Sequence, residues 1–327
     1  MTRRVAAIDC GTNSLRLLIA DADPASRRLV DVQRRMEIVR LGQGVDATGV
    51  LAPDALARTF RVLADYAREI RDAGATRVRM VATSATRDAR NAADFTGGVQ
   101  ETLGIMPEVV SGGEEALLSF AGATTELTTA DPDARAGTAP HPPYLVVDIG
   151  GGSTEFVLGG SHDADLASAA SGLSAMSVDI GCVRLTERHL HSDPPTEAEI
   201  KGATADIEHA LDAVGAAIAV ADARTLVGLA GSVTTVAAIA LGLADYDPGR
   251  THHARISAGA VHAVTSELLA ATRRERAAIG SMHPGRVDVI GAGALVLDQV
   301  MQRFGFAEVV TSEHDILDGI AWSIALD

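Results

Sequence analysis

The sequence predicts an α/β fold built as two domains. Its 327 residues correspond, as a prior, to about two domains of ordinary size. Apolar runs of strand length alternate with segments of helical periodicity, as in α/β domains. A short pattern, Asp-x-Gly-x-x-Ser, follows an apolar run twice, at Asp9 and at Asp148. Because each copy stands at the start of one half of the chain, we interpret the recurrence as a duplicated domain.

The first half opens with two apolar runs, 5–9 and 15–21, joined by a polar turn. This pattern predicts a β-hairpin. From Pro53 onwards apolar residues recur at helical spacing, which predicts a helix. The other elements expected in this half are strands over 29–41 and 78–83, a helix over 91–103, a strand that ends at 110 before the segment 111–115, and then a helix through 125.

A proline-rich segment separates the two halves. Residues 128–143 contain four prolines, a composition typical of a linker or inter-domain loop. We therefore expect one domain over 1–127 and a second over 144–314, which begins again with a strand, a glycine turn and a strand. The uncharged stretch 226–244 has the length of a membrane span, but its glycines and hydroxyls favour a strand, a turn and a helix.

The charge balance excludes several classes of function. The net charge is −15, so a broad nucleic-acid surface is not expected. Lys201 is the one lysine among 28 basic residues, and Gly202 follows it, so the chain has no P-loop and little scope for lysine-based catalysis. Its two cysteines form no CxxC or zinc spacing. With no signal-peptide pattern at the N-terminus, we expect a soluble cytoplasmic protein that binds no membrane.

Both glycine turns predict phosphate binding. Successive backbone N–H groups in such a turn form a nest for phosphate oxygens. Asp9 and Asp148 would repel phosphate unless a cation intervenes, so they predict a divalent metal, Mg²⁺ or Mn²⁺, with Glu155 as a further carboxylate. We expect the two turns to face each other across a cleft and to hold one polyphosphate. The residues expected to bind phosphate there are Gly11, Thr12, Asn13, Ser14, Gly150, Gly151, Gly152 and Ser153.

Two further patterns have competing interpretations. Gly231 and Ser232 lie between an expected strand and helix, where a helix N-terminus can bind an anion; the competing interpretation is a tight structural turn. Cys10 and Arg16 have the C-x₅-R spacing of cysteine-dependent phosphatases. That chemistry needs a low-pKa thiol at the start of a helix. Since a strand is expected after Cys10, a small buried residue is the favoured interpretation.

Four motifs occur in order, at residues 9–14, 82–87, 111–116 and 148–155. Together they resemble the exopolyphosphatase/guanosine pentaphosphate phosphatase (Ppx/GppA) family, which belongs to the actin/sugar kinase/Hsp70 superfamily. The resemblance covers essentially the whole chain and implies two ribonuclease-H-like domains flanking a cleft, in the short two-domain class. A final helix, 315–327, is expected to pack back on the first domain. The arginine- and alanine-rich composition suggests an actinobacterial type.

The resemblance also implies roles for single residues. Glu114 would be the general base that activates water, while a purely structural interpretation makes Glu114 and Glu115 a helix-capping pair. Arg87 would contact phosphate, unless it forms a surface ion pair with Asp88 or Asp94. Asp148 would hold the metal, and Glu155 would be its partner or orient the water. Three residues of further family motifs receive no role, namely Arg184, Glu187 and His314.

The expected function is hydrolysis of the terminal phosphoanhydride of inorganic polyphosphate. The acidic net charge favours short chains, since little basic surface is left to hold a long anion. Guanosine pentaphosphate (pppGpp), a substrate linked to the stringent response, shares the terminal linkage and is the main competing substrate. Two further hypotheses are a (p)ppGpp-binding protein with weak turnover and a sugar or acetate kinase of the same superfamily. A homodimer is an expectation from the family alone.

Overall fold

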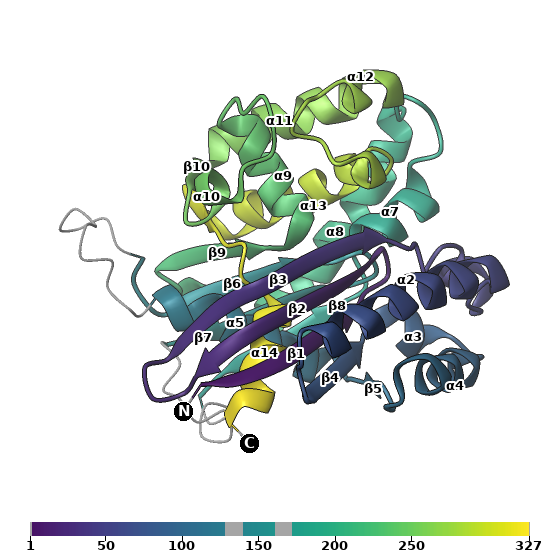
Figure 1. The fold of residues 1–327 in the computed structure, drawn as a ribbon. Helices are drawn as coiled ribbons and strands as arrows, with labels where there is room; N and C mark the ends of the chain where they lie inside the picture. The colour runs from purple at the N-terminus through teal and green to yellow at the C-terminus, as the bar shows by residue number, and fades with distance from the viewer. Residues whose placement is uncertain (1, 128–139, 161–171, 327) are drawn as a thin grey trace. The chain divides into compact units, whose positions relative to one another are not determined.

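The computed structural model describes residues 2–127, 140–160 and 172–326 (Figure 1). Most of the predicted linker, residues 128–139, lies outside the described residues. The chain divides into two compact units, of which the first comprises Met1–Thr125 and His314–Asp327 and the second Glu126–Glu313. Among the described residues, no helix is long and apolar enough to cross a membrane.

The first unit is a five-stranded sheet with helices on both faces. The strand order is β3-β2-β1-β4-β5, in which β1, β2 and β3 are antiparallel neighbours while β4 and β5 run parallel to β1. The elements of this unit are β1 (Arg3–Cys10), β2 (Ser14–Asp23), β3 (Arg28–Ile38), α1 (Val45–Thr48), α2 (Pro53–Asp72), β4 (Arg77–Ala82), α3 (Ser84–Asp88), α4 (Ala92–Leu103), β5 (Glu108–Val109), α5 (Gly112–Leu127) and α14 (Ile316–Leu326).

The alternation of side chains along β1 divides its core into two layers. Ala6, Ile8 and Cys10 pack with residues of α2 and α4, whereas Val5 and Ala7 pack with residues of α5 and α14. This is the two-residue period of a strand that is buried on both faces. The same period places Asp9 on the α5 and α14 face.

The expected hairpin and helices of this unit are confirmed, and the third strand is shorter than predicted. It ends at Ile38, three residues before the predicted end at 41. Beyond it, the N–H groups of Val39 and Arg40 donate to the carbonyl of Asn13 instead of continuing the ladder. The short helix α3 was not predicted, because five residues give no periodicity to detect.

The second unit repeats the strand order of the first. From one edge its sheet runs β8-β7-β6-β9-β11-β10, with β9 and β11 parallel to β6 and with β10 added antiparallel at the end. Its elements are β6 (Tyr144–Ile149), β7 (Thr154–Gly159), β8 (Ser174–Val178), α7 (Cys182–His189), α8 (Glu197–Ala217), β9 (Thr225–Leu229), α9 (Ala230–Ala240), α10 (Pro248–Thr251), β10 (Arg255–Ser257), α11 (Ala258–Ala270), α12 (Arg273–Ala277), α13 (Ile290–Phe304) and β11 (Glu308–Thr311).

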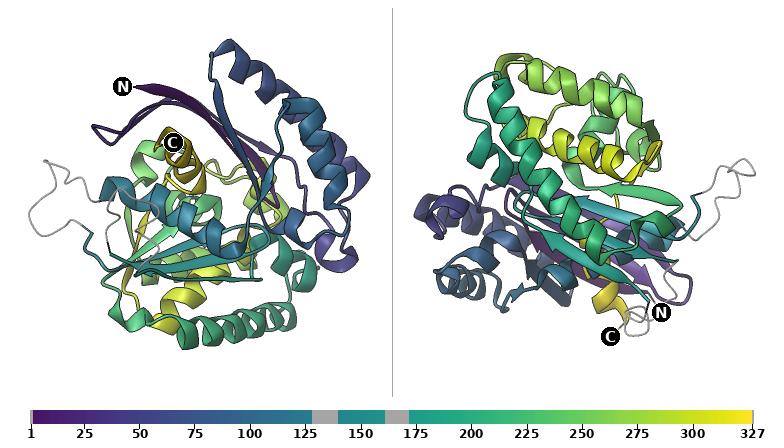
Figure 2. Two further views of the ribbon diagram at one scale, coloured as in Figure 1. Left: turned by 90° about the horizontal axis from the view of Figure 1, so that it is seen from below. Right: turned by 180° about the vertical axis from the view of Figure 1, so that it is seen from behind.

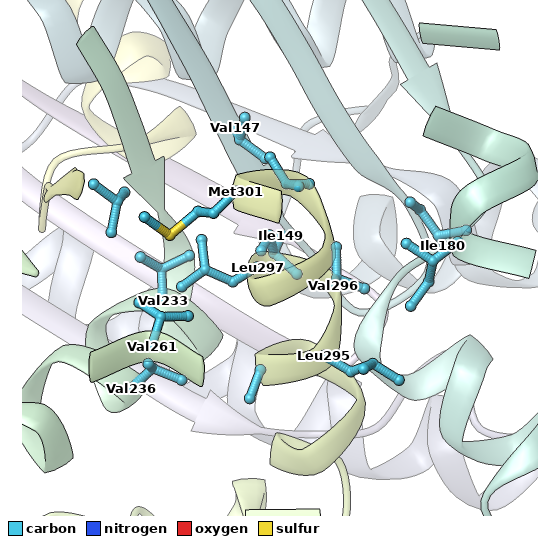
Figure 3. Close-up of a cluster of buried hydrophobic side chains, with 14 of the residues drawn as sticks. Val147, Ile149, Ile180, Val233, Val236, Val261, Leu295, Val296, Leu297 and Met301 are labelled. Carbon is cyan, nitrogen blue, oxygen red and sulfur yellow. The ribbon is translucent and has the colours of Figure 1, made fainter. Parts of the chain in front are cut away.

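The shared order confirms the α/β fold with two ribonuclease-H-like domains. In the second unit, α8 and α13 lie side by side over one face of the sheet (Figure 2). Val147 and Ile149 of β6 pack there with Leu297 and Met301 of α13 (Figure 3). The uncharged stretch 226–244 is the predicted strand, turn and helix, as β9 and α9.

Candidate active site

The two predicted phosphate turns have the same backbone geometry. In the first, the N–H of Gly11 donates to the carbonyl of Ser14 at 3.0 Å. In the second, the N–H of Gly150 donates to the carbonyl of Ser153 at 3.1 Å. Each turn joins an antiparallel pair at the carboxyl end of the first strand. The repeated sequence pattern therefore corresponds to a repeated turn.

The carbonyl groups of the first turn accept hydrogen bonds from main-chain N–H groups of the segment that follows β3. The N–H of Gly42 donates to the carbonyl of Thr12 at 2.8 Å, and the carbonyl of Asn13 accepts from Val39 and Arg40 at 3.1 and 2.8 Å. A side chain at Gly42 would lie 2.3 Å from the Cγ2 of Thr12, so only glycine allows this approach. The Thr12 hydroxyl lies 2.9 Å from that of Ser84 at the start of α3.

Asp9 forms an ion pair with an arginine side chain, that of Arg16. Arg16, its cross-strand partner on β2, donates to Asp9 Oδ2 from Nε at 2.9 Å and from Nη2 at 2.6 Å, and also pairs with Asp315. Asp9 Oδ1 is buried and has no hydrogen-bond partner within the described residues. Burial raises the pKa of Asp9 although Arg16 opposes the shift. For Asp315 burial also disfavours the charge, but Arg16, together with Arg34 and the N–H of Leu317, outweighs burial and holds the pKa below its usual value.

The second turn carries two buried carboxylates in place of this ion pair. Asp148 and Glu155 are direct cross-strand partners on β6 and β7, and their exposed fractions are 7% and 2%. The Ser177 hydroxyl on β8 donates to Glu155 Oε1 at 2.7 Å. The carbonyls of residues 150–152 accept hydrogen bonds from the start of α7. Within the described residues, no group of three or more His, Cys, Asp or Glu side chains could hold a metal ion.

The two glutamates at the start of α5 point to different partners. The Glu114 side chain is 46% exposed, and its Oε1 lies 3.0 Å from Arg79, which lies three residues before the end of β4 and also pairs with Glu108. The Glu115 side chain is 10% exposed, and its Oε2 lies 3.1 Å from Arg87.

Arg87 lies on α3, directly after β4, and donates to the carbonyl of Val110 at 3.0 Å, just after β5. Since β1, β4 and β5 are parallel, their carboxyl ends meet at one edge of the sheet. The structure therefore groups Arg87 and Glu115 with the first turn at this edge. It pairs Arg87 with Glu115 rather than with Asp88 or Asp94, and it directs Glu114 back along β4.

Gly231 and Ser232 lie in a packed strand–helix turn. Ser232 is 3% exposed, and a Cβ at Gly293 would come within 2.3 Å of its hydroxyl oxygen. A Cβ at Gly231 would lie 1.6 Å from a guanidinium nitrogen of Arg286. These contacts favour the structural interpretation of the turn, and phosphate binding there stays a prediction.

Cys10 has the surroundings of a core residue. Its side chain is buried among those of α2 and α4, and Leu15 and Arg16 belong to β2, not to a helix. Burial, together with the charge of Asp9, raises the pKa of the Cys10 thiol well above its usual value. A nucleophilic thiolate is the opposite requirement, so the geometry supports the structural role.

Three residues that the structure places close to the site received no catalytic or binding role from the sequence. Glu115 was considered only as one member of a helix-capping pair with Glu114. Gly181 and Arg184 contact the second turn directly, and the family motif that contains Arg184 and Glu187 was the signal for them. Spacing alone did not reveal which strand or turn that motif would meet.

Comparisons with known proteins identify the family of the chain. The family model described as "Ppx/GppA phosphatase family" matches residues 18–327. Exopolyphosphatase 2 of Mycobacterium tuberculosis is 48% identical over 333 residues, which cover 98% of each chain. The crystal structure of an exopolyphosphatase-like protein, 41% identical, superposes with a TM-score of 0.86 over 97% of each chain.

A Ppx/GppA family member from Aquifex aeolicus, 29% identical, superposes with a TM-score of 0.78 over 100% of this chain and 98% of that one. The family model and the identities span nearly the full length. The chain therefore belongs to the Ppx/GppA phosphatase family.

Proposed function

We propose that the chain is an exopolyphosphatase-type hydrolase that releases terminal phosphate from inorganic polyphosphate and prefers short chains. The family and the 48% identity to a protein named exopolyphosphatase 2 support this assignment. The observation that carries it is the second turn, where three successive N–H groups and two buried carboxylates occur together. N–H groups of this kind stabilise charge on a transferring phosphoryl group.

We propose that Asp148 and Glu155 hold Mg²⁺ or Mn²⁺. Like charges directly opposite each other on neighbouring strands destabilise a sheet, so a cation fits between these cross-strand partners. Mg²⁺ is commonly held by one or two carboxylates, with water and substrate phosphate completing its shell, and the pair matches that donor set. The bound ion would neutralise charge on the terminal phosphate oxygens. Asp9, also predicted as a ligand, is better explained as the partner of Arg16.

We propose Glu115 as the general base in place of Glu114. A base must hold one water in line with the phosphorus atom, and a side chain fixed by Arg87 is better suited to that task than an exposed one. Glu114 instead shares Arg79 with Glu108. Arg87 would also offer its remaining N–H groups to phosphate oxygens.

The function is tested with purified protein, Mg²⁺ and polyphosphates of defined length. We expect phosphate release with the largest kcat/KM on the shortest chains. A preference for very long chains, or for pppGpp, would contradict the substrate assignment. Phosphorylation of a sugar by ATP without polyphosphate hydrolysis would indicate a kinase, and tight binding of ppGpp without turnover would indicate a binding protein.

The base is tested by a matched pair of substitutions. Glu115→Gln is expected to lower kcat by about 10²–10⁴-fold, the usual contribution of an acid–base residue. Glu114→Gln on the same helix turn should stay within about fivefold, because an exposed ion pair contributes little. If Glu114→Gln shows the larger loss, Glu114 is the base and Glu115 is structural.

A further inference from the structure

The carbonyl groups of three successive residues in the second turn all accept hydrogen bonds from residues at the start of α7. The Gly150 carbonyl accepts from the N–H of Cys182 at 2.9 Å. The Gly151 carbonyl accepts from the N–H groups of Val183 and Arg184 at 2.8 and 3.1 Å. These donors are the first N–H groups of α7, which have no partner within their own helix.

The third carbonyl, that of Gly152, is held by a side chain. Arg184 donates to it from Nε at 2.7 Å, and the N–H of Gly181 adds a longer bond of 3.2 Å. The Arg184 side chain is 12% exposed, and its Nη2 lies 3.6 Å from Asp179 Oδ1. A Cβ at Gly181 would lie 2.3 Å from the Gly151 carbonyl, so this approach requires glycine.

Because the peptide bond is planar, the direction of these three carbonyls also sets the direction of the three N–H groups that follow them. In a trans peptide the carbonyl of one residue and the N–H of the next point in opposite directions. Because three carbonyls point toward α7, the N–H groups of Gly151, Gly152 and Ser153 point away from it. Within the part of the chain that the structure describes, these three N–H groups donate to no protein acceptor.

We propose that Arg184 is a positioning residue for the phosphate nest, acting through the Gly152 carbonyl and not by contact with the substrate. Its Nε fixes the peptide between Gly152 and Ser153, and so aims the Ser153 N–H at a phosphate oxygen. The inference rests on the proposed function, because the orientation of these N–H groups affects activity only if the turn binds phosphate. It gives a role to a motif residue that the resemblance left unassigned.

Two substitutions at Arg184 separate hydrogen bonding from charge. Arg184→Met removes the donor, whereas Arg184→Gln keeps an N–H donor at the same distance along the side chain without the charge. We expect Arg184→Met to lower kcat about tenfold with a smaller change in KM. One of the three N–H donors, that of Ser153, would no longer be held in the orientation that favours the transition state. Arg184→Gln should stay within about threefold of wild type. Arg188→Met, which removes an exposed arginine of the same helix that pairs with Asp206, is the control and should match wild type.

A second readout does not depend on turnover. Amide ¹H–¹⁵N signals of residues 151–153 are followed as inorganic phosphate is added with Mg²⁺ present. We expect shifts in wild type and in Arg184→Gln, and an apparent phosphate affinity about threefold weaker in Arg184→Met, in keeping with the smaller change expected in KM. Equal losses of phosphate affinity in both variants would mean that Arg184 acts through its charge and not through the hydrogen bond that orients the peptide. That result would overturn the inference.

Unchanged shifts in Arg184→Met would overturn it as well. If Arg184→Met does not fold, Arg184→Gln decides: wild-type shifts and kcat support the proposal, and their loss refutes it. An absence of shifts at residues 151–153 in wild type itself would overturn phosphate binding at this turn, and the inference with it.

Discussion

The turn that ends β1 and the turn that ends β6 share a backbone and differ in electrostatics. Both carry an aspartate at the same position and close with the same N–H to carbonyl bond. The residue directly across the strand pair from that aspartate is Arg16 in the first turn and Glu155 in the second. The first turn therefore pairs its aspartate with a cation across the strands, whereas the second turn places a second carboxylate at the same position.

The supports behind the two turns differ as well. The carbonyls of the first are held by main-chain N–H groups of residues 39–42, and those of the second by the start of α7 together with Arg184. A helix terminus offers several aligned donors at once, so three carbonyls of the second turn are drawn to one side. The comparison teaches that one turn geometry can be held by different supports and carry different side chains, and that only the second turn combines it with the carboxylate pair that we propose as the metal site.

The largest effect is expected when the second turn is given the ion pair of the first. Glu155→Arg would place a guanidinium opposite Asp148, as Arg16 stands opposite Asp9. We expect kcat/KM to fall by about 10³-fold or more, because the cation site is lost, while the folded state is kept by the new pair. Activity and Mn²⁺ binding by calorimetry are the measurements. Full activity or intact Mn²⁺ binding would show that the second turn is not the metal site.

A smaller effect, on stability, is expected at the ion pair of the first turn. The pKa of Asp315 is lowered in the folded state from an ordinary value of 3.8, so the folded protein binds this proton less readily than the unfolded chain. Its contribution is therefore fully present above about pH 4 and is lost as the pH falls through the lower folded pKa. Asp315→Asn should reduce the free energy of unfolding by roughly 2 kcal/mol.

That loss should be equal at pH 7 and pH 5, because Asp315 is ionised in both states of wild type at these values. It should shrink below about pH 4, measured by urea unfolding of both proteins. If the loss of unfolding free energy in Asp315→Asn instead grows as the pH falls, the pKa of Asp315 is raised in the folded state. The ion pair of the first turn would then not stabilise the charged carboxylate.

The sequence was sufficient for the fold because its strands are short apolar runs with clear turns between them. The hairpins, α2 and the strand–turn–helix at 225–240 all follow from periodicity and glycine placement. The repeated Asp-x-Gly-x-x-Ser pattern also identified both turns and, through them, the duplication. These features depend on residues close together in the sequence.

What the sequence could not decide depends on residues far apart in it. Asp9 was predicted as a metal ligand because an aspartate beside a phosphate-binding turn would repel phosphate unless a cation intervenes. Arg16 becomes its partner only through the register of β1 and β2, and Asp315 only through the packing of α14. Likewise, Glu114 and Glu115 are adjacent in the sequence, and only α3 and β4 show that one meets Arg87 and the other Arg79.

The smallest effect is expected at Cys10, where the two turns differ by a thiol and the side chain of Ile149. Both side chains are buried, so the comparison predicts that each only fills space beneath its turn. Cys10→Ser should leave kcat within about threefold of wild type, since a buried thiol with a raised pKa is inert. Cys10→Ala is the matched control, because it removes the sulfur without adding a hydroxyl that must be buried. Polyphosphate hydrolysis and the melting temperature are measured for both. A 10³-fold loss of kcat in both variants at unchanged melting temperature would instead make the first turn a cysteine-dependent phosphatase loop, and the likeness between the two turns would then be one of backbone alone.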